Sequence, residues 1–67
     1  MDELKKMATR KGFVEVFWAR LQEHNRAGEE ISMCKLYGEM AQEYEAEYRH
    51  ELFPSYNAFS KWLRRHH

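Results

Sequence analysis

The sequence predicts an all-α fold in the form of one compact three-helix domain. Apolar residues recur at spacings of three and four in three separate stretches, and no stretch alternates apolar and polar residues as a half-buried strand does. A serine or threonine precedes each stretch and is suited to cap the start of a helix. The 67 residues suffice for one domain only, since a chain this short buries about 60% of the surface its unfolded state exposes.

The first helix is predicted over residues 10–27, after a flexible N-terminal arm of residues 1–9 whose side chains are mostly polar. Thr9 is the expected N-cap, because its hydroxyl can accept a hydrogen bond from a free N–H of the first turn. Gly28 is expected to end the helix, because glycine readily takes the left-handed conformation that closes helices. The apolar stripe of this helix consists of Phe13, Val14, Phe17, Trp18 and Leu21.

The second helix is predicted over residues 33–46, with a further extension as far as Arg49. Ser32 is its expected N-cap. Gly38 lowers the helix propensity and indicates a close approach by another backbone. The apolar face of this helix consists of Met33, Leu36, Tyr37, Met40, Ala41, Tyr44 and Tyr48.

The third helix is predicted over residues 56–65, so that the three-helix domain spans residues 10–67. Pro54 separates it from the second helix, because the residue before a proline is disfavoured in the helical region. Ser55 is the expected N-cap. The core-facing side chains are Tyr56, Phe59 and Leu63, with Trp62 at their edge, and the opposite face carries Asn57, Lys61, Arg64 and Arg65.

The net charge of zero hides an uneven distribution along the chain. Residues 1–28 carry a net charge of +2, residues 29–53 carry −5, and residues 54–67 carry +3 with no acidic residue at all. Such an asymmetry bears on the partners of a protein, not on its fold.

The basic last helix predicts DNA as a partner. Arginine and lysine pair with guanine in the major groove, asparagine pairs with adenine, and further cations contact the phosphates. The residues expected to contact DNA are Ser55, Asn57, Ser60, Lys61, Arg64 and Arg65, and those of a basic arm on the phosphates are Lys5, Lys6, Arg10 and Lys11. The alternative is that the cations of the last helix only keep it solvated and complement its C-terminal dipole.

An aromatic-rich first helix that ends in glycine is followed by a Leu-Tyr helix and by a final helix of pattern Ser-Tyr–x2–Phe–x2–Trp-Leu-Arg-Arg. The residues in this pattern are Phe13, Phe17, Leu21, Gly28, Leu36, Tyr37, Ser55, Tyr56, Phe59, Trp62, Leu63, Arg64 and Arg65. The pattern resembles small helix-turn-helix accessory proteins of plasmid mobilisation and conjugation. The resemblance implies a helix-turn-helix-like pairing of the last two helices and sequence-specific DNA binding by the last helix, in a plasmid or another mobile element such as a phage.

The chain departs from that pattern between its last two helices. Residues 45–53 form a longer connection than the turn of three or four residues that usually joins such helices. The connection is also acidic, because it contains Glu45, Glu47 and Glu51, and a carboxylate near a phosphate backbone opposes binding.

The acidic face of the second helix, formed by Glu39, Glu43 and Glu47, allows two interpretations. One is a solvated face that balances the charge of the protein. The other is a docking surface for a protein with a basic surface, which would make the chain a protein-binding module or a phage-type inhibitor. Trp18 and Trp62 lie at the edges of apolar stripes, where a half-exposed ring could contact a partner or a second copy in a homodimer.

Enzymatic activity is not predicted. Cys34 has no histidine close to it in the sequence, the histidines do not form a spaced metal-binding motif with it, and the three glycines are too scattered for a phosphate-binding loop. These histidines are His24, His50, His66 and His67. The sequence therefore predicts no metal and no cofactor. No apolar run approaches the roughly 20 residues of a membrane helix, and a cytoplasmic protein is expected.

Overall fold

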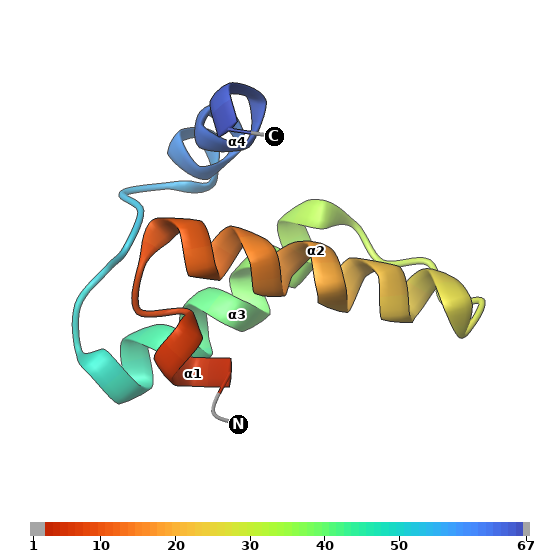
Figure 1. The fold of residues 1–67 in the computed structure, drawn as a ribbon, viewed down its shortest axis with the longest axis horizontal. Helices are drawn as coiled ribbons and strands as arrows, with labels where there is room; N and C mark the ends of the chain where they lie inside the picture. Colours follow the sequence, from red (N-terminus) through yellow and green to blue (C-terminus); the bar gives the residue numbers. More distant parts are fainter. Residues whose placement is uncertain (1–2, 67) are drawn as a thin grey trace.

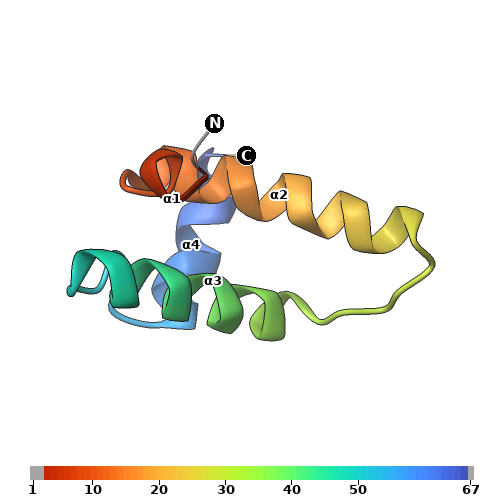
Figure 2. The same ribbon diagram turned by 90° about the horizontal axis from the view of Figure 1, so that it is seen from below.

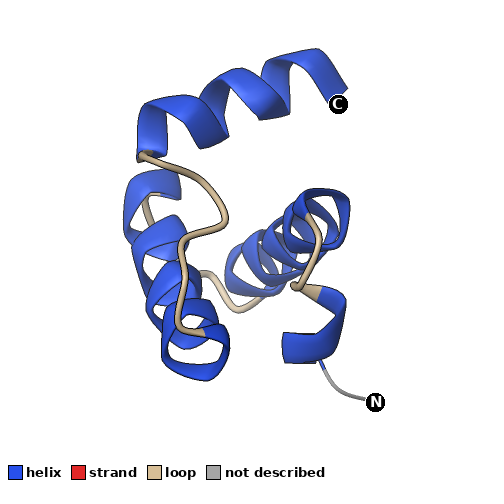
Figure 3. Cartoon of the chain, turned by 90° about the vertical axis from the view of Figure 1, so that its left-hand side faces the viewer, coloured by secondary structure: helices blue, strands red, loops and turns tan. Residues whose placement is uncertain are grey.

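The computed structural model describes residues 3–66, in which four helices and no strand occur. The helices are α1 (Glu3–Lys6), α2 (Arg10–Arg26), α3 (Met33–Tyr48) and α4 (Tyr56–His66). The helices α2 and α3 form a pair, and α4 lies across one side of it (Figures 1 and 2). The short helix α1 lies on the other side (Figure 3). The all-α prediction is confirmed, and the three longer helices match the three predicted ones.

Each of the three long helices begins where a hydroxyl side chain caps it. The hydroxyls of Thr9, Ser32 and Ser55 each accept a hydrogen bond from the backbone N–H three residues further on, at 3.0, 3.1 and 3.3 Å. These bonds satisfy one of the N–H groups that have no partner inside a helix. The three N-caps expected from the sequence are therefore confirmed.

The ends of α2 and α3 both involve a left-handed backbone. Gly28, with φ of 75°, follows the last turn of α2 as expected. The helix α3 continues to Tyr48, and Arg49 then takes φ of 60° and ψ of 26°. The N–H of Arg49 donates to the carbonyl of Glu45 at 2.7 Å, which closes the last turn. Residues 49–55 connect α3 to α4, a longer connection than a turn of three or four residues.

Replacing Arg49 with glycine is expected to stabilise the protein. An L-amino acid in the left-handed region is strained, and glycine is not, so R49G should raise the free energy of unfolding by about 0.5–1 kcal/mol. Urea unfolding followed by circular dichroism measures the change. The control is R49A, which removes the same side chain but keeps the strain. An equal effect of the two substitutions would assign any gain to the loss of the arginine instead.

The core lies between α2, α3 and α4 and is rich in aromatic rings. The ring of Phe59, on α4, is fully buried and meets the rings of Phe13 and Phe17 edge-on, with centroids 5.5 and 4.9 Å apart. Edge-to-face contacts of this kind are favourable beyond the area that they bury. The buried apolar residues are Met7, Phe13, Val14, Val16, Phe17, Leu36, Met40, Tyr44, Phe53, Phe59 and Leu63.

The segment expected to be a flexible arm is packed in the structure. Met7 has 0% of its surface exposed, Leu4 is half-buried against the core, and the Tyr48 hydroxyl donates to the Leu4 carbonyl at 3.2 Å. The spacing of three between Leu4 and Met7 lets both reach the core from one turn of helix, although the residues around them are polar. Residues 3–9 therefore belong to the fold, and residues 1 and 2 of the expected arm lie outside the described residues.

The close backbone approach expected at Gly38 is wrong. Nothing lies within 4 Å of the position that a Cβ atom would take there, so this glycine only weakens α3. The close approach occurs at Gly12 instead, where a Cβ atom would overlap the carbonyl oxygen of Lys6. The chain reverses between α1 and α2 at this point, and only a hydrogen in place of a side chain allows the two backbones to meet.

Among the residues that the structure describes, no helix has both the length and the apolar character needed to cross a bilayer.

Candidate functional site

The helix α4 presents its polar side chains to the solvent because its apolar side chains are used in the core. Phe59 and Leu63 are buried and Tyr56 is half-buried, so Lys61 and Arg64 lie on the exposed side. Of the other residues expected to contact DNA, Asn57 and Arg65 are exposed and Ser60 is half-buried. Ser55 is exposed, and its hydroxyl accepts the hydrogen bond that caps α4.

Arg10, the first residue of α2, is held in place by groups from the connection before α4 and from α4 itself. Its guanidinium carbon lies 5.4 Å from the centroid of the Phe53 ring and 5.7 Å from that of the Trp62 ring. Its Nε donates a hydrogen bond to the carbonyl of Leu52 at 3.3 Å. Cation–π contacts and a hydrogen bond thus fix a side chain that the sequence assigned to a flexible basic arm.

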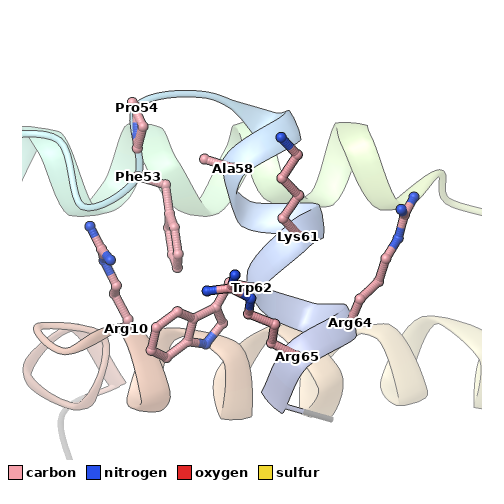
Figure 4. Close-up of a pocket in the computed structure, with 8 residues that line it drawn as sticks. All are labelled: Arg10, Phe53, Pro54, Ala58, Lys61, Trp62, Arg64 and Arg65. Carbon is pink, nitrogen blue, oxygen red and sulfur yellow. The ribbon is translucent and has the colours of Figure 1, made fainter.

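These residues surround an open hollow of about 440 Å³. It lies between the start of α2, the Phe53-Pro54 segment and α4 (Figure 4). Its lining residues are Arg10, Phe53, Pro54, Ala58, Lys61, Trp62, Arg64 and Arg65. Four of them are cationic and none is acidic. We call this hollow the cationic hollow.

The chemistry of the cationic hollow suits an anion. Cations gathered beside low-dielectric aromatic walls concentrate a positive potential, and arginine presents planar pairs of N–H donors to phosphate or carboxylate oxygens. In Figure 4, Arg65 extends in the direction of Arg10, whereas Arg64 extends away from it. The arginines therefore differ in the direction from which they can contact a bound group.

The other residues of the expected basic arm do not join this site. Lys6 forms an ion pair with Glu15 at 3.4 Å. Lys5 and Lys11 are exposed, but neither lines the cationic hollow. Of the four arm residues expected from the sequence, Arg10 is the one that the structure brings together with the cations of α4.

One of the three carboxylates of the acidic face expected on α3 forms an ion pair within the protein. Glu43 binds Arg20 of α2 at 2.5 Å, and Glu3 of α1 binds the same guanidinium at 3.0 Å. The hydrogen bond that Arg20 donates to the Glu43 carboxylate is the main cause that raises the pKa of Arg20, against the opposing effect of its partial burial. Glu43 therefore helps to join α1, α2 and α3, while Glu39 and Glu47 are exposed to solvent.

The glutamates expected in the connection before the last helix are placed differently: Glu45 and Glu47 lie in the last turn of α3, and Glu51 lies in the connection after it. Burial raises the pKa of the Tyr37 hydroxyl, and the negative charges of Glu45 and Glu51 raise it further. Neither glutamate lines the cationic hollow, nor does Glu47.

The two tryptophans expected at stripe edges are both half-buried, but their surroundings differ. Trp62 lies against Arg10, a use of the ring that the sequence did not indicate. Trp18 lines a second, shallower hollow of about 320 Å³ together with Met33, Ser60, Leu63 and Arg64.

Within residues 3–66, no group of three histidine, cysteine or acidic side chains is placed so that it could hold a metal ion. The chain matches no protein-family model, no curated protein sequence and no solved structure. The resemblance to plasmid mobilisation proteins stays a hypothesis from the sequence.

Proposed function

We propose that the protein binds duplex DNA through α4 and the cationic hollow. The observation that supports this proposal best is the arrangement of Arg10, Lys61, Arg64 and Arg65 around one hollow that no carboxylate of residues 3–66 lines. In a chain of zero net charge, such a concentration of cations on one side is a feature of nucleic-acid-binding surfaces.

In this proposal α4 enters the major groove with its exposed face towards the bases. Asn57, Lys61 and Arg64 supply the donor and acceptor types that read adenine and guanine edges. The position of α4 on the outer side of the α2–α3 pair leaves that face accessible (Figure 3). The helices α3 and α4 then act as a helix-turn-helix-like unit with a long connection, in an accessory or regulatory protein of a plasmid or phage as the sequence resemblance implies.

The alternative function, in which the acidic face of α3 docks on a basic protein, has less support. Glu43 is engaged by Arg20, so that two of the three expected carboxylates, Glu39 and Glu47, are left for a partner.

The test is the binding of a labelled DNA duplex by fluorescence anisotropy at several salt concentrations. The double variant K61A/R64A is expected to weaken binding by about tenfold or more and to relax the preference for one DNA sequence, because two side chains that read base edges are lost, whereas the unaltered protein should bind less tightly as the salt concentration rises. The matched control is R26A/K35A, which removes the same charge from two exposed residues that do not line the cationic hollow.

The control is expected to retain most of the affinity of the unaltered protein. An equal loss in both double variants would mean that net charge alone governs binding, and it would overturn the role of α4. No salt-dependent binding by the unaltered protein would overturn DNA binding itself. Binding that instead required Glu39 and Glu47, with a basic protein as the ligand, would favour the alternative.

A further inference from the structure

The fixed position of Arg10 suggests a more specific role than a general contribution to the positive potential. An exposed arginine normally samples many rotamers, and ordering it on binding has an entropic cost. Here contacts with Phe53, Trp62 and the Leu52 carbonyl restrict the guanidinium, although Arg10 remains exposed to solvent. The side chain is therefore preorganised for a contact with a fixed geometry.

We propose that Arg10 and Arg65 form a phosphate clamp, which holds one phosphate group of the DNA backbone in the cationic hollow. This inference rests on the proposed function and deepens it. The clamp joins the start of α2 to the last turns of α4, and so it fixes how deeply and at which register α4 lies in the groove.

The hydrogen-bond donors of Arg10 match this role. A guanidinium carries five N–H donors, and the bond to Leu52 uses the one on Nε. The two terminal nitrogens carry four more that this bond does not use, and their parallel N–H groups fit two oxygens of one phosphate. The two aromatic rings lie beside the guanidinium, which stays exposed and accessible to an anion.

Arg65 completes the clamp from the other side of the cationic hollow. It is exposed, and it extends in the direction of Arg10 in Figure 4. Arg64 extends the other way and remains available for a different contact with the duplex. In this arrangement Arg10 and Arg65 position the DNA backbone, whereas other residues of α4 reach the bases. Contacts to phosphates position a protein on DNA but carry no sequence information.

The test compares R10A with R26A, which removes the same charge from an exposed side chain at the other end of α2, outside the cationic hollow. R10A is expected to weaken binding about tenfold, equally for two duplexes of unrelated sequence, and to reduce the salt slope by about 1. R26A should change affinity by less than about twofold. R10K should resemble R10A, because a lysine cannot present paired donors from a plane.

Arg10 also contacts the core, so thermal unfolding by circular dichroism must accompany these measurements. If R10A does not fold, R65A decides, since Arg65 is exposed and its removal leaves the contacts of Arg10 in place. Affinities of R10A or R65A equal to that of R26A would overturn the clamp while leaving DNA binding intact. Absence of binding by the unaltered protein would instead overturn the proposed function.

Discussion

Replacing Phe59 with alanine is expected to lower the free energy of unfolding by about 3–5 kcal/mol, the largest effect of any single substitution in α4. The ring has 0% of its surface exposed and contacts Phe13, Phe17 and Phe53 edge-on, with the last centroid 5.2 Å away. Its loss leaves a cavity where α4 meets α2. Domains of this length have a total stability of roughly 3–10 kcal/mol, so F59A should be largely unfolded well below the midpoint temperature of the unaltered protein.

Urea unfolding followed by far-ultraviolet circular dichroism measures this loss. The control is Y56A, which removes a half-buried ring from the same helix and should have a clearly smaller effect. If F59A and Y56A were equally stable, the packing of α4 would not depend on the buried ring, and the arrangement of α4 across the α2–α3 pair would be in error. DNA binding by F59A should fail together with folding.

Replacing Gly12 with alanine is expected to lower the free energy of unfolding by about 1–3 kcal/mol, even though alanine is the better helix former. The new methyl group would overlap the carbonyl oxygen of Lys6, which is a backbone atom and cannot turn aside as a side chain can. It would also approach the Thr9 hydroxyl to 3.0 Å, where that hydroxyl caps α2. The segment of residues 3–9 must therefore shift away from α2.

The matched control is Gly38, where the same substitution should have the opposite sign. G38A meets nothing within 4 Å, and it should raise the free energy of unfolding by about 0.5–1 kcal/mol through helix propensity alone. Hydrogen exchange gives a second measurement, since the amides of residues 3–9 should exchange faster in G12A but not in G38A. Stabilisation by both substitutions would show that the reversal between α1 and α2 tolerates a side chain.

Most of the secondary structure could be predicted because its causes lie close together in the sequence. The caps at Thr9, Ser32 and Ser55 depend on a hydroxyl and an N–H three residues away, and Gly28 depends on its own backbone freedom. The core-facing residues of α4 follow from helical spacing alone. The end of α3 at Tyr48 lies within the predicted extension. The left-handed conformation of Arg49 could not be predicted from its residue type, because few residues other than glycine take this conformation.

The burial of residues 3–9 and the close approach at Gly12 could not be predicted in the same way. Both depend on where α1 meets α2 in space, and a spacing of three between Leu4 and Met7 amounts to a single turn of apolar face. One turn is too short a pattern to separate a packed helix from a polar terminus. Gly12 and Gly38 both lie inside helices, and only the tertiary contact with Lys6 distinguishes Gly12 from Gly38.

The candidate site also has one part that the sequence predicted and one part that depends on the tertiary structure. The sequence by itself determined the three long helices, their caps and the basic exposed face of α4, because local hydrogen bonds and helical periodicity govern all of these. Only the tertiary structure decided that Arg10 lies beside that face and that Phe53 and Trp62 hold it there, since these residues are brought together across more than forty positions of chain. It also decided that Glu43 forms an ion pair with Arg20 of α2 at the surface. Contacts between distant segments depend on how the helices pack, and helix packing is the one quantity that no short stretch of sequence contains.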